Sequence, residues 1–360
     1  MIPKGLLKRG LVWLALCLCF PFIGIWMAGG DLTPILEFPP KLRYMENLSF
    51  VDEVGVVYWF GMGILFLWLL WRRGQMFVPS EFPRKNRFPA WGWLAIVVTL
   101  ISWVLAWTRL EGFAWGQRYT FTPLWLGYIV TVNAWIQSRK GKCPMLRRPF
   151  FFAMLFPVSA IFWWIFEYYN RFVQNWIYLG VDVGPAEYFI HASICFSTVL
   201  PAVYSTAVAL ECLPGLQREM TGPNFQIKNP KLWAWTTLTV TSIAFLCIGI
   251  YPQFLYPLLW TGPLLIWLSL SQLNNEPEYF GKLEVGDWRT VWTWALAALI
   301  CGFFWEMWNF HSLAKWEYQV PFLHGALIFE MPLAGYLGYL PFGLECCLMT
   351  GLVSRVLSGR

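Results

Sequence analysis

Residues 149–168 read PFFFAMLFPVSAIFWWIFEY, twenty residues with a single charge at Glu167. A helix of this length spans about 30 Å, the thickness of the hydrocarbon layer of a membrane. The whole chain has a similar composition: of its 360 residues, 58% are hydrophobic, 19% are aromatic and only 13% are charged. Soluble domains carry about 25% charged residues, and a water-soluble fold could not cover so much apolar surface. The sequence therefore predicts an all-α, polytopic integral membrane protein.

Apolar runs of comparable length recur along the chain and predict about ten transmembrane helices. Continuous runs are typical of helices, because strands of membrane β-barrels are shorter and alternate. The run that follows Lys4, Lys8 and Arg9 lacks a good cleavage site, so we expect it to stay as a signal anchor. The predicted spans are 11–29, 54–71, 90–107, 120–137, 149–168, 188–209, 232–250, 254–272, 290–308 and 331–353.

The positive charges are distributed unevenly between the two sides of these spans. With a cytoplasmic N-terminus, most of the 26 Lys and Arg residues lie on the inner side. This bias predicts an even number of spans with both termini inside, in a cell membrane of the bacterial inner-membrane type. The net charge of +6 is thus a topology signal, and we expect no nucleic-acid partner. The outer side keeps six basic residues: Lys41, Arg43, Arg109, Arg118, Arg171 and Lys315.

Short motifs recur in the same order at offsets between 134 and 142 residues, as the numbering shows. This self-similarity predicts a tandem duplication of a four-helix unit, residues 88–212 and 230–353, after two N-terminal helices in residues 1–87. Units with an even number of spans are parallel, so a pseudo-twofold axis along the membrane normal would relate them. The matched pairs are Trp91-Gly-Trp93 with Trp233-Ala-Trp235, Pro123 with Pro257, Glu167-x-x-Asn170 with Glu306-x-x-Asn309, Trp176-Ile-Tyr178 with Trp316-Glu-Tyr318, and Leu200-Pro201 with Leu340-Pro341.

Glu167 and Glu306 come near the outer ends of their spans, and Asn170 and Asn309 follow them on the same helix face. Ionisable residues at membrane depth are rare and mark functional sites. Each amide is placed to bind its carboxylate or to line one cavity with it. Facing each other across the axis, the two carboxylates could act as a catalytic acid and base. The alternative is that Glu-x-x-Asn caps a helix end and anchors it in the headgroup region.

The last span contains two Pro and three Gly between Glu330 and Glu345. Such interruptions free backbone groups, and broken helices that carry carboxylates often line substrate or ion paths. We therefore expect both Glu residues in the catalytic site; the alternative is a kinked packing helix. The segment Leu340-Pro341-Phe-Gly-Leu-Glu345 resembles the membrane domains of lycopene cyclases, which place two Glu directly after Pro and a hydrophobic residue. This chain has one Glu there, and Ser205 in the first repeat, so we do not assign it to that family.

Aromatic residues flank the repeated Glu motifs and could cradle a cation or an isoprenoid chain. The alternative is packing against lipid. The loops on the outer side are unusually polar, which favours a site on that face, used by either an enzyme or a docking subunit. We expect no metal site, because His191, His311 and His324 form no HxxxH or HExxH motif. The predicted substrate-binding residues are Trp163, Trp164, Trp305, Trp308, Arg171 and His311.

Motifs for familiar membrane chemistry are missing from the sequence. The nine Cys form no CxxC pair, and we find no P-loop, diphosphate motif or haem-ligating His pair, so no cofactor is indicated. The predicted function is a membrane-embedded enzyme with an outer-facing, aromatic-lined carboxylate site for a lipid or isoprenoid. One alternative is a transporter or flippase with a broken last helix. The other is an anchor or scaffold subunit that docks a membrane or periplasmic protein partner.

Overall fold

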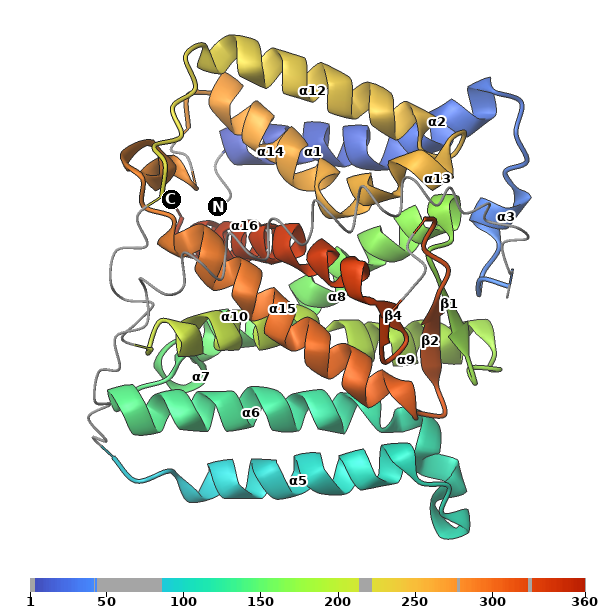
Figure 1. The fold of residues 1–360 in the computed structure, drawn as a ribbon, viewed down its shortest axis with the longest axis vertical. Helices are drawn as coiled ribbons and strands as arrows, with labels where there is room; N and C mark the ends of the chain where they lie inside the picture. Colours follow the sequence, from blue (N-terminus) through green and yellow to red (C-terminus); the bar gives the residue numbers. More distant parts are fainter. Residues whose placement is uncertain are drawn as a thin grey trace.

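The computed structural model describes residues 4–41, 43, 86–213, 222–276, 279–322 and 326–359. Most of these residues are helical, and the strands among them are short (Figure 1). The elements up to the middle of the chain are α1 (Lys4–Leu14), the π-helical η1 (Ala15–Cys19), α2 (Phe20–Met27), α3 (Thr33–Leu36), α5 (Ala90–Trp107), η2 (Glu111–Tyr119), α6 (Phe121–Lys140), α7 (Pro144–Arg147), α8 (Pro149–Val173), β1 (Trp176–Leu179), α9 (Pro185–Phe196) and α10 (Val199–Leu210). They are followed by α12 (Pro230–Cys247), α13 (Pro252–Leu255), η3 (Tyr256–Trp260), α14 (Gly262–Leu273), η4 (Gly281–Val285), α15 (Arg289–Phe310), β2 (Lys315–Tyr318), β3 (Leu327–Ile328), β4 (Met331–Pro332), η5 (Leu333–Gly338) and α16 (Tyr339–Ser358).

Six helical segments of the described chain are long and apolar enough to cross a membrane. A seventh results if the helices on either side of a 58° bend, Pro252–Trp260 and Gly262–Leu273, form one span. The chain is therefore a mostly helical, multi-pass, membrane-embedded protein. The six are Gly5–Met27, Ala90–Trp107, Pro149–Val173, Pro185–Leu210, Arg289–Phe310 and Leu333–Ser358.

This number is lower than the ten spans expected from the sequence. The predicted spans 120–137 and 232–250 do form helices, α6 and α12, but neither is apolar enough to meet the same criterion. Thr, Asn and Gln residues lower the hydropathy of α6, and Thr and Ser residues lower that of α12. The predicted span 54–71 lies outside the described residues.

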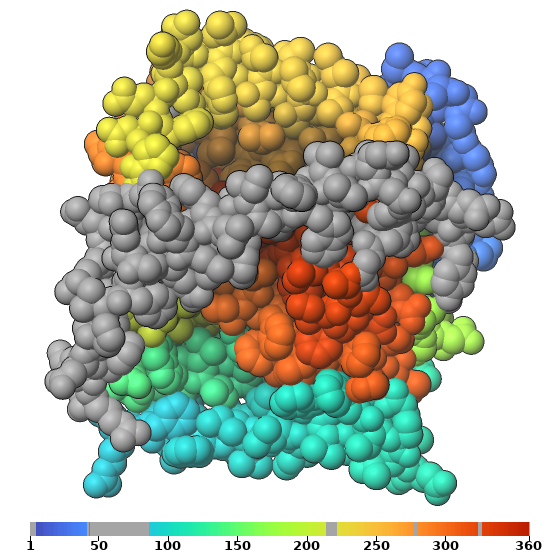
Figure 2. Space-filling model, in the orientation of Figure 1, coloured from blue at the N-terminus to red at the C-terminus, as the bar shows by residue number. Residues whose placement is uncertain are grey.

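The helices lie side by side and run between two ends of the molecule (Figure 1). The pair α5 and α6 forms one flank, and α12 with α14 forms the other. Between them, α10 packs on α15 and α8 packs on α16, while α1 and α2 lie against α14 and α12. Both chain termini lie at one end, and β1 and β2 lie at the opposite end. Figure 2 shows the same face, where the end of the chain from α15 onward reaches the surface between the flanks.

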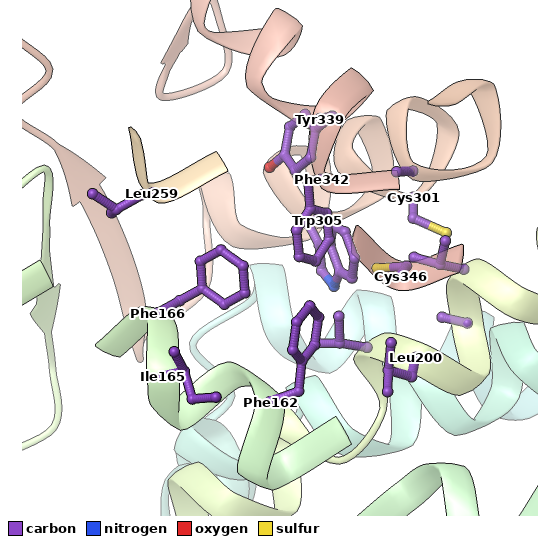
Figure 3. Packing of buried hydrophobic residues seen from close by; sticks show 14 of the residues in the cluster. Phe162, Ile165, Phe166, Leu200, Leu259, Cys301, Trp305, Tyr339, Phe342 and Cys346 are labelled. Atoms are coloured by element: carbon purple, nitrogen blue, oxygen red, sulfur yellow. The ribbon is translucent and has the colours of Figure 1, made fainter. Parts of the chain in front are cut away.

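The core between the flanks is made of large aromatic side chains from α8, α15 and α16. Figure 3 shows Phe162 and Phe166 of α8 facing Trp305 of α15 and Phe342 of α16. The rings of Phe162 and Phe342 are stacked at 6.0 Å between centroids. Helices α15 and α16 approach closely at Gly343, where a Cβ would lie 2.2 Å from the Trp294 carbonyl oxygen. Small residues at such crossings are typical of membrane helices.

Candidate functional site

A two-stranded ribbon joins the ends of α8 and α15. Strand β1 pairs with β2 in antiparallel register, with Trp176 opposite Tyr318, Ile177 opposite Glu317 and Tyr178 opposite Trp316. These strands are the Trp-x-Tyr triplets that the sequence comparison matched with each other. The central residues Ile177 and Glu317 therefore pair with each other, and the Trp of each triplet lies opposite the Tyr of the other.

Asn170 and Asn309 hold the two strands to their helices in the same way. The Asn170 side chain donates Nδ2 to the Trp176 carbonyl oxygen at 2.7 Å and accepts the Trp176 N–H at 3.3 Å. Asn309 donates to the Trp316 carbonyl oxygen at 2.7 Å and accepts its N–H at 2.8 Å. Both amides therefore bind the backbone of the ribbon. The helical spacing alone had suggested the carboxylates of Glu167 and Glu306 as their partners instead.

Glu167 is buried and accepts hydrogen bonds from three side chains at one oxygen. Tyr178 Oη donates to Oε1 at 2.6 Å, Trp163 Nε1 at 3.1 Å and Trp176 Nε1 at 3.2 Å. Two of these donors come from β1, so the carboxylate also ties the ribbon to α8. Charge-assisted hydrogen bonds of this kind are stronger than neutral ones.

Glu306 has the equivalent Tyr donor but differs in the two Trp donors. Tyr339 takes the place of Trp163, and Trp316 Nε1 donates to Tyr318 Oη at 2.9 Å. Glu306 Oε1 accepts Tyr318 Oη at 2.7 Å and Tyr339 Oη at 2.6 Å. The donors to Glu167 and Glu306 share no residue, so these hydrogen bonds do not join the two carboxylates into a pair. Burial, and then the neighbouring carboxylate, raise the pKa of Tyr178 and of Tyr318 well above the usual value, so both phenols remain donors at neutral pH.

The presence of Tyr339 as a donor in place of a Trp has a steric explanation. Trp163 lies one turn before Glu167, and the equivalent position in α15 is Gly302. A Cβ at Gly302 would lie 2.4 Å from the Tyr339 ring, so the absent side chain makes room for this ring. In the first half the position that matches Tyr339 is Val199, which has no donor. Glu167 thus receives a further donor from α8, at Trp163, and Glu306 receives one from α16, at Tyr339.

An aromatic cavity of about 130 Å³ lies against the ribbon, with walls from both halves of the chain. Engineered apolar cavities of roughly 150 Å³ bind benzene, so the space suits a ring or a segment of hydrocarbon chain. Trp163 and Trp305, two of the predicted substrate-binding residues, lie in its wall with their rings 6.4 Å apart. The other aromatic wall residues are Phe121, Trp176, Tyr178, Tyr188, Phe196, Trp260, Trp316, Tyr318 and Tyr339.

One wall of this cavity carries a thiol and an imidazole from α9. Cys195 Sγ lies 3.6 Å from His191 Nε2, and both residues line the cavity. Glu187 lies one turn before His191 and accepts Tyr119 Oη at 2.8 Å. The sequence prediction missed this group, although Glu187, His191 and Cys195 follow one another at i, i+4 and i+8. Residues at this spacing share a helix face.

A second cavity, of about 80 Å³, adjoins the first behind Trp176 and Tyr178 and is lined by charged residues. Lys41, Arg43 and Arg171 bring three positive charges, and Glu37 brings a negative one. Arg43 Nη2 lies 3.0 Å from Glu37 Oε2, and Arg171 Nη1 donates to the Glu37 carbonyl oxygen at 2.7 Å. Lys41 and Arg43 lower the pKa of Glu37, because they stabilise its charged form. Glu167 and Asn170 also line this second cavity. We call it the charged chamber.

Other predicted site residues do not line either cavity. Trp164 stacks on Phe189 with centroids 5.4 Å apart, and Trp308 packs against Trp125 at 5.1 Å. The His311 ring contacts the Trp107 ring at 5.0 Å. These contacts are of the kind expected for packing.

The remaining predicted carboxylates also lie away from the cavity walls. Glu330 accepts the Lys315 ammonium at 2.7 Å, and Lys315 itself does line the aromatic cavity. Glu345 lies deep inside α16. In the described part of the chain, no three His, Cys, Asp or Glu residues are grouped as metal ligands would be. His324 lies outside that part.

Comparison with protein-family models, with curated proteins and with solved structures finds no match to this chain.

Proposed function

We propose that this protein is a membrane-embedded enzyme that acts on a lipid or isoprenoid molecule. The observation that carries the proposal is the aromatic cavity, whose walls come from both halves and which adjoins the charged chamber. Ligand pockets are typically apolar with a few placed polar groups. An amphiphile matches the pair of cavities, with its chain among the Trp and Tyr rings and its head beside the Arg and Lys residues.

The head of the substrate would be anionic. The charged chamber holds three basic side chains and one acidic side chain among its described residues, apart from the carboxylate of Glu167, which accepts three hydrogen bonds. Arg171 and Arg43 carry guanidinium groups, which match phosphate and carboxylate geometry. A phosphate or carboxylate head placed here would lie next to Tyr178, while the chain extended past Trp176 into the aromatic cavity.

The reacting groups would be His191 and Cys195. Both face the aromatic cavity, and a thiol beside an imidazole can act as nucleophile and base. Glu187 on the preceding turn would orient the imidazole, as the third member of such groups does. In this proposal Glu167, Glu306, Asn170 and Asn309 position the ribbon, and with it Tyr178, Tyr318 and the flanking Trp residues.

We also propose that the chain arose by tandem duplication of a four-helix unit. The matched Asn contacts, the matched Glu–Tyr contacts and the self-paired ribbon support this proposal. The unequal basic charges support a topology with both termini inside a bacterial-type inner membrane and the ribbon outside.

The test is native mass spectrometry with lipid analysis of the protein purified gently from its own membrane. We expect a bound lipid or isoprenoid, and we expect Trp163→Ala and Trp305→Ala variants to lose it. Trp115→Ala is the matched control, since Trp115 is 76% exposed and away from the cavity. Co-purified protein subunits without a specific small molecule would contradict the enzyme proposal and favour the scaffold alternative.

A further inference from the structure

Glu345 is a carboxylate in the protein interior that the proposed reaction does not use. It is 1% exposed and lies on α16, one of the membrane-spanning segments. Neither carboxylate oxygen has a hydrogen-bond partner among the described residues. The N–H of Leu264 approaches the carboxylate but falls outside the geometry of a hydrogen bond. Glu167 and Glu306, at similar burial, each accept at least two hydrogen bonds.

The walls around Glu345 come from elements whose regular helical structure is interrupted. Cys17 belongs to the π-helical turn η1, and π-helical turns occur frequently at functional sites. Leu264 lies in the first turn of α14, directly after the 58° bend in the chain. In transporters, broken spans direct helix ends toward bound ions and substrates. The structure therefore brings an unpaired carboxylate to the junction of two interrupted helices.

The other titratable groups that face Glu345 are Cys17 on η1, Tyr169 on α8 and Cys346 on α16. All three are uncharged at neutral pH in their protonated forms, and the Tyr169 hydroxyl also lacks a hydrogen-bond partner among the described residues. No cation of the described chain acts on Glu345.

The buried cation Arg9 is engaged elsewhere. Arg9 on α1 pairs with Glu276 at 2.5 Å, and its guanidinium lies over the Trp267 ring at 4.6 Å. An ionised carboxylate at the Glu345 position would be a buried charge without a partner among the described residues, which is strongly unfavourable. The carboxylate therefore requires a positive charge from outside the described chain.

We propose that Glu345 is a proton-binding site at membrane depth. A proton by itself neutralises the charge of the carboxylate, whereas a metal cation needs several oxygen ligands. No such group of ligands surrounds Glu345 in the described chain. The proton can leave only when water or a cation reaches the carboxylate. Such access would open at the π-helical turn η1 or at the start of α14, where the regular helical structure is interrupted. Proton binding at Glu345 would thus couple to the packing of η1 and α14 around it.

The test uses dicyclohexylcarbodiimide, an apolar reagent that adds to protonated carboxylic acids inside membranes. The full-length protein in lipid nanodiscs is treated at several pH values, and the adduct is located by peptide mass spectrometry. We expect an adduct on Glu345 that decreases as the pH rises and disappears in Glu345→Gln. Glu330→Gln is the matched control, because Glu330 is ion-paired with Lys315 and the variant should retain the adduct.

A second measurement covers the case in which the reagent cannot reach the residue. Infrared difference spectra between low and high pH should show the C=O band of a neutral carboxylic acid, shifted in Glu345→Asp. The proposal is overturned if the protein shows neither the adduct nor this band at any pH. It is also overturned if sodium chloride suppresses the adduct and choline chloride of equal ionic strength does not, because the ligand would then be a sodium ion.

Discussion

Ile177 and Glu317 lie directly opposite each other in the β1–β2 ribbon, and each is the central residue of a Trp-x-Tyr triplet. When a residue in an antiparallel pair faces its own equivalent, a local twofold axis passes between them. The ribbon therefore joins two segments with similar sequences. The Asn170 and Asn309 contacts are alike on the two sides, and so are the Tyr178 and Tyr318 contacts to Glu167 and Glu306.

Replacing Asn309 with Ala should destabilise the protein by about 1–3 kcal/mol, because two backbone groups of the ribbon lose their partner. Asn170→Ala should act in the same direction. The double variant should lose less than the sum, since both residues hold one ribbon and their effects are coupled. Thermal or denaturant unfolding in detergent measures this, with Asn229→Ala as the control because Asn229 makes no side-chain cap. Strictly additive losses would show that the two contacts are independent.

Gly302→Ala should destabilise the protein by roughly 1–3 kcal/mol, because the new Cβ meets the Tyr339 ring at 2.4 Å. The second substitution Tyr339→Val, which installs the residue of the matching position Val199, should relieve part of this clash. Gly112→Ala is the control, since its Cβ would have no neighbour within 4 Å. The same unfolding experiment reports both effects. An equal cost for Gly302→Ala with and without Tyr339→Val would contradict the steric explanation.

His191→Gln should lower turnover of the bound lipid by about 10²-fold or more, the usual contribution of a general base. Cys195→Ser should remove most of the turnover, while both variants keep the lipid, because the aromatic walls are unchanged. Before the substrate is known, the rate of Cys195 alkylation by N-ethylmaleimide serves as the measurement, and His191→Gln should slow it. Cys247 in the same protein is the internal reference. Loss of the lipid together with activity would point to a structural role for these residues.

The ion pairs of Glu37 should make stability depend on pH in the acid range. The pKa of Glu37 is lowered from its usual 4.5, chiefly by Lys41 and then by Arg43. The contribution is therefore fully present above pH 4.5 and is lost as the pH falls through the lowered value. Unfolding of the wild type and Glu37→Gln should be compared between pH 3 and 7. Their difference should shrink on acidification, and a constant difference across this range would refute the assignment.

The membrane character and most helices were predictable, because long apolar runs have one stable solution in a bilayer. The motif match also paired Glu167 with Glu306, and each of them accepts a hydrogen bond from the Tyr of its matched triplet. Their partners were not predictable, because Tyr178 and Tyr339 reach these carboxylates only after short segments outside the helices fold back. A four-residue strand such as β1 has too little periodicity to be recognised in so aromatic a sequence.

The group on α9 illustrates a different reason for failure. No sequence motif marks Glu187, His191 and Cys195 on this apolar helix. Their proposed role becomes visible only because His191 and Cys195 line a cavity. The predicted spacing of Asn170 from Glu167 was correct as helix geometry. The amide turned to the ribbon because unpaired backbone groups of an isolated pair of strands need partners more than a carboxylate that already has three donors.

The ribbon also bears on how the halves of the molecule can move. Alternating access by rocking requires one half to tilt against the other about a central site. Here a strand from each half shares one hydrogen-bonded ladder at one end of the bundle, so a tilt that opens this end must tear the ladder apart. A tilt that opens the opposite end would leave the hydrogen bonds between β1 and β2 intact. The paired strands therefore restrict how far the chain segments that carry them can separate at this end of the bundle.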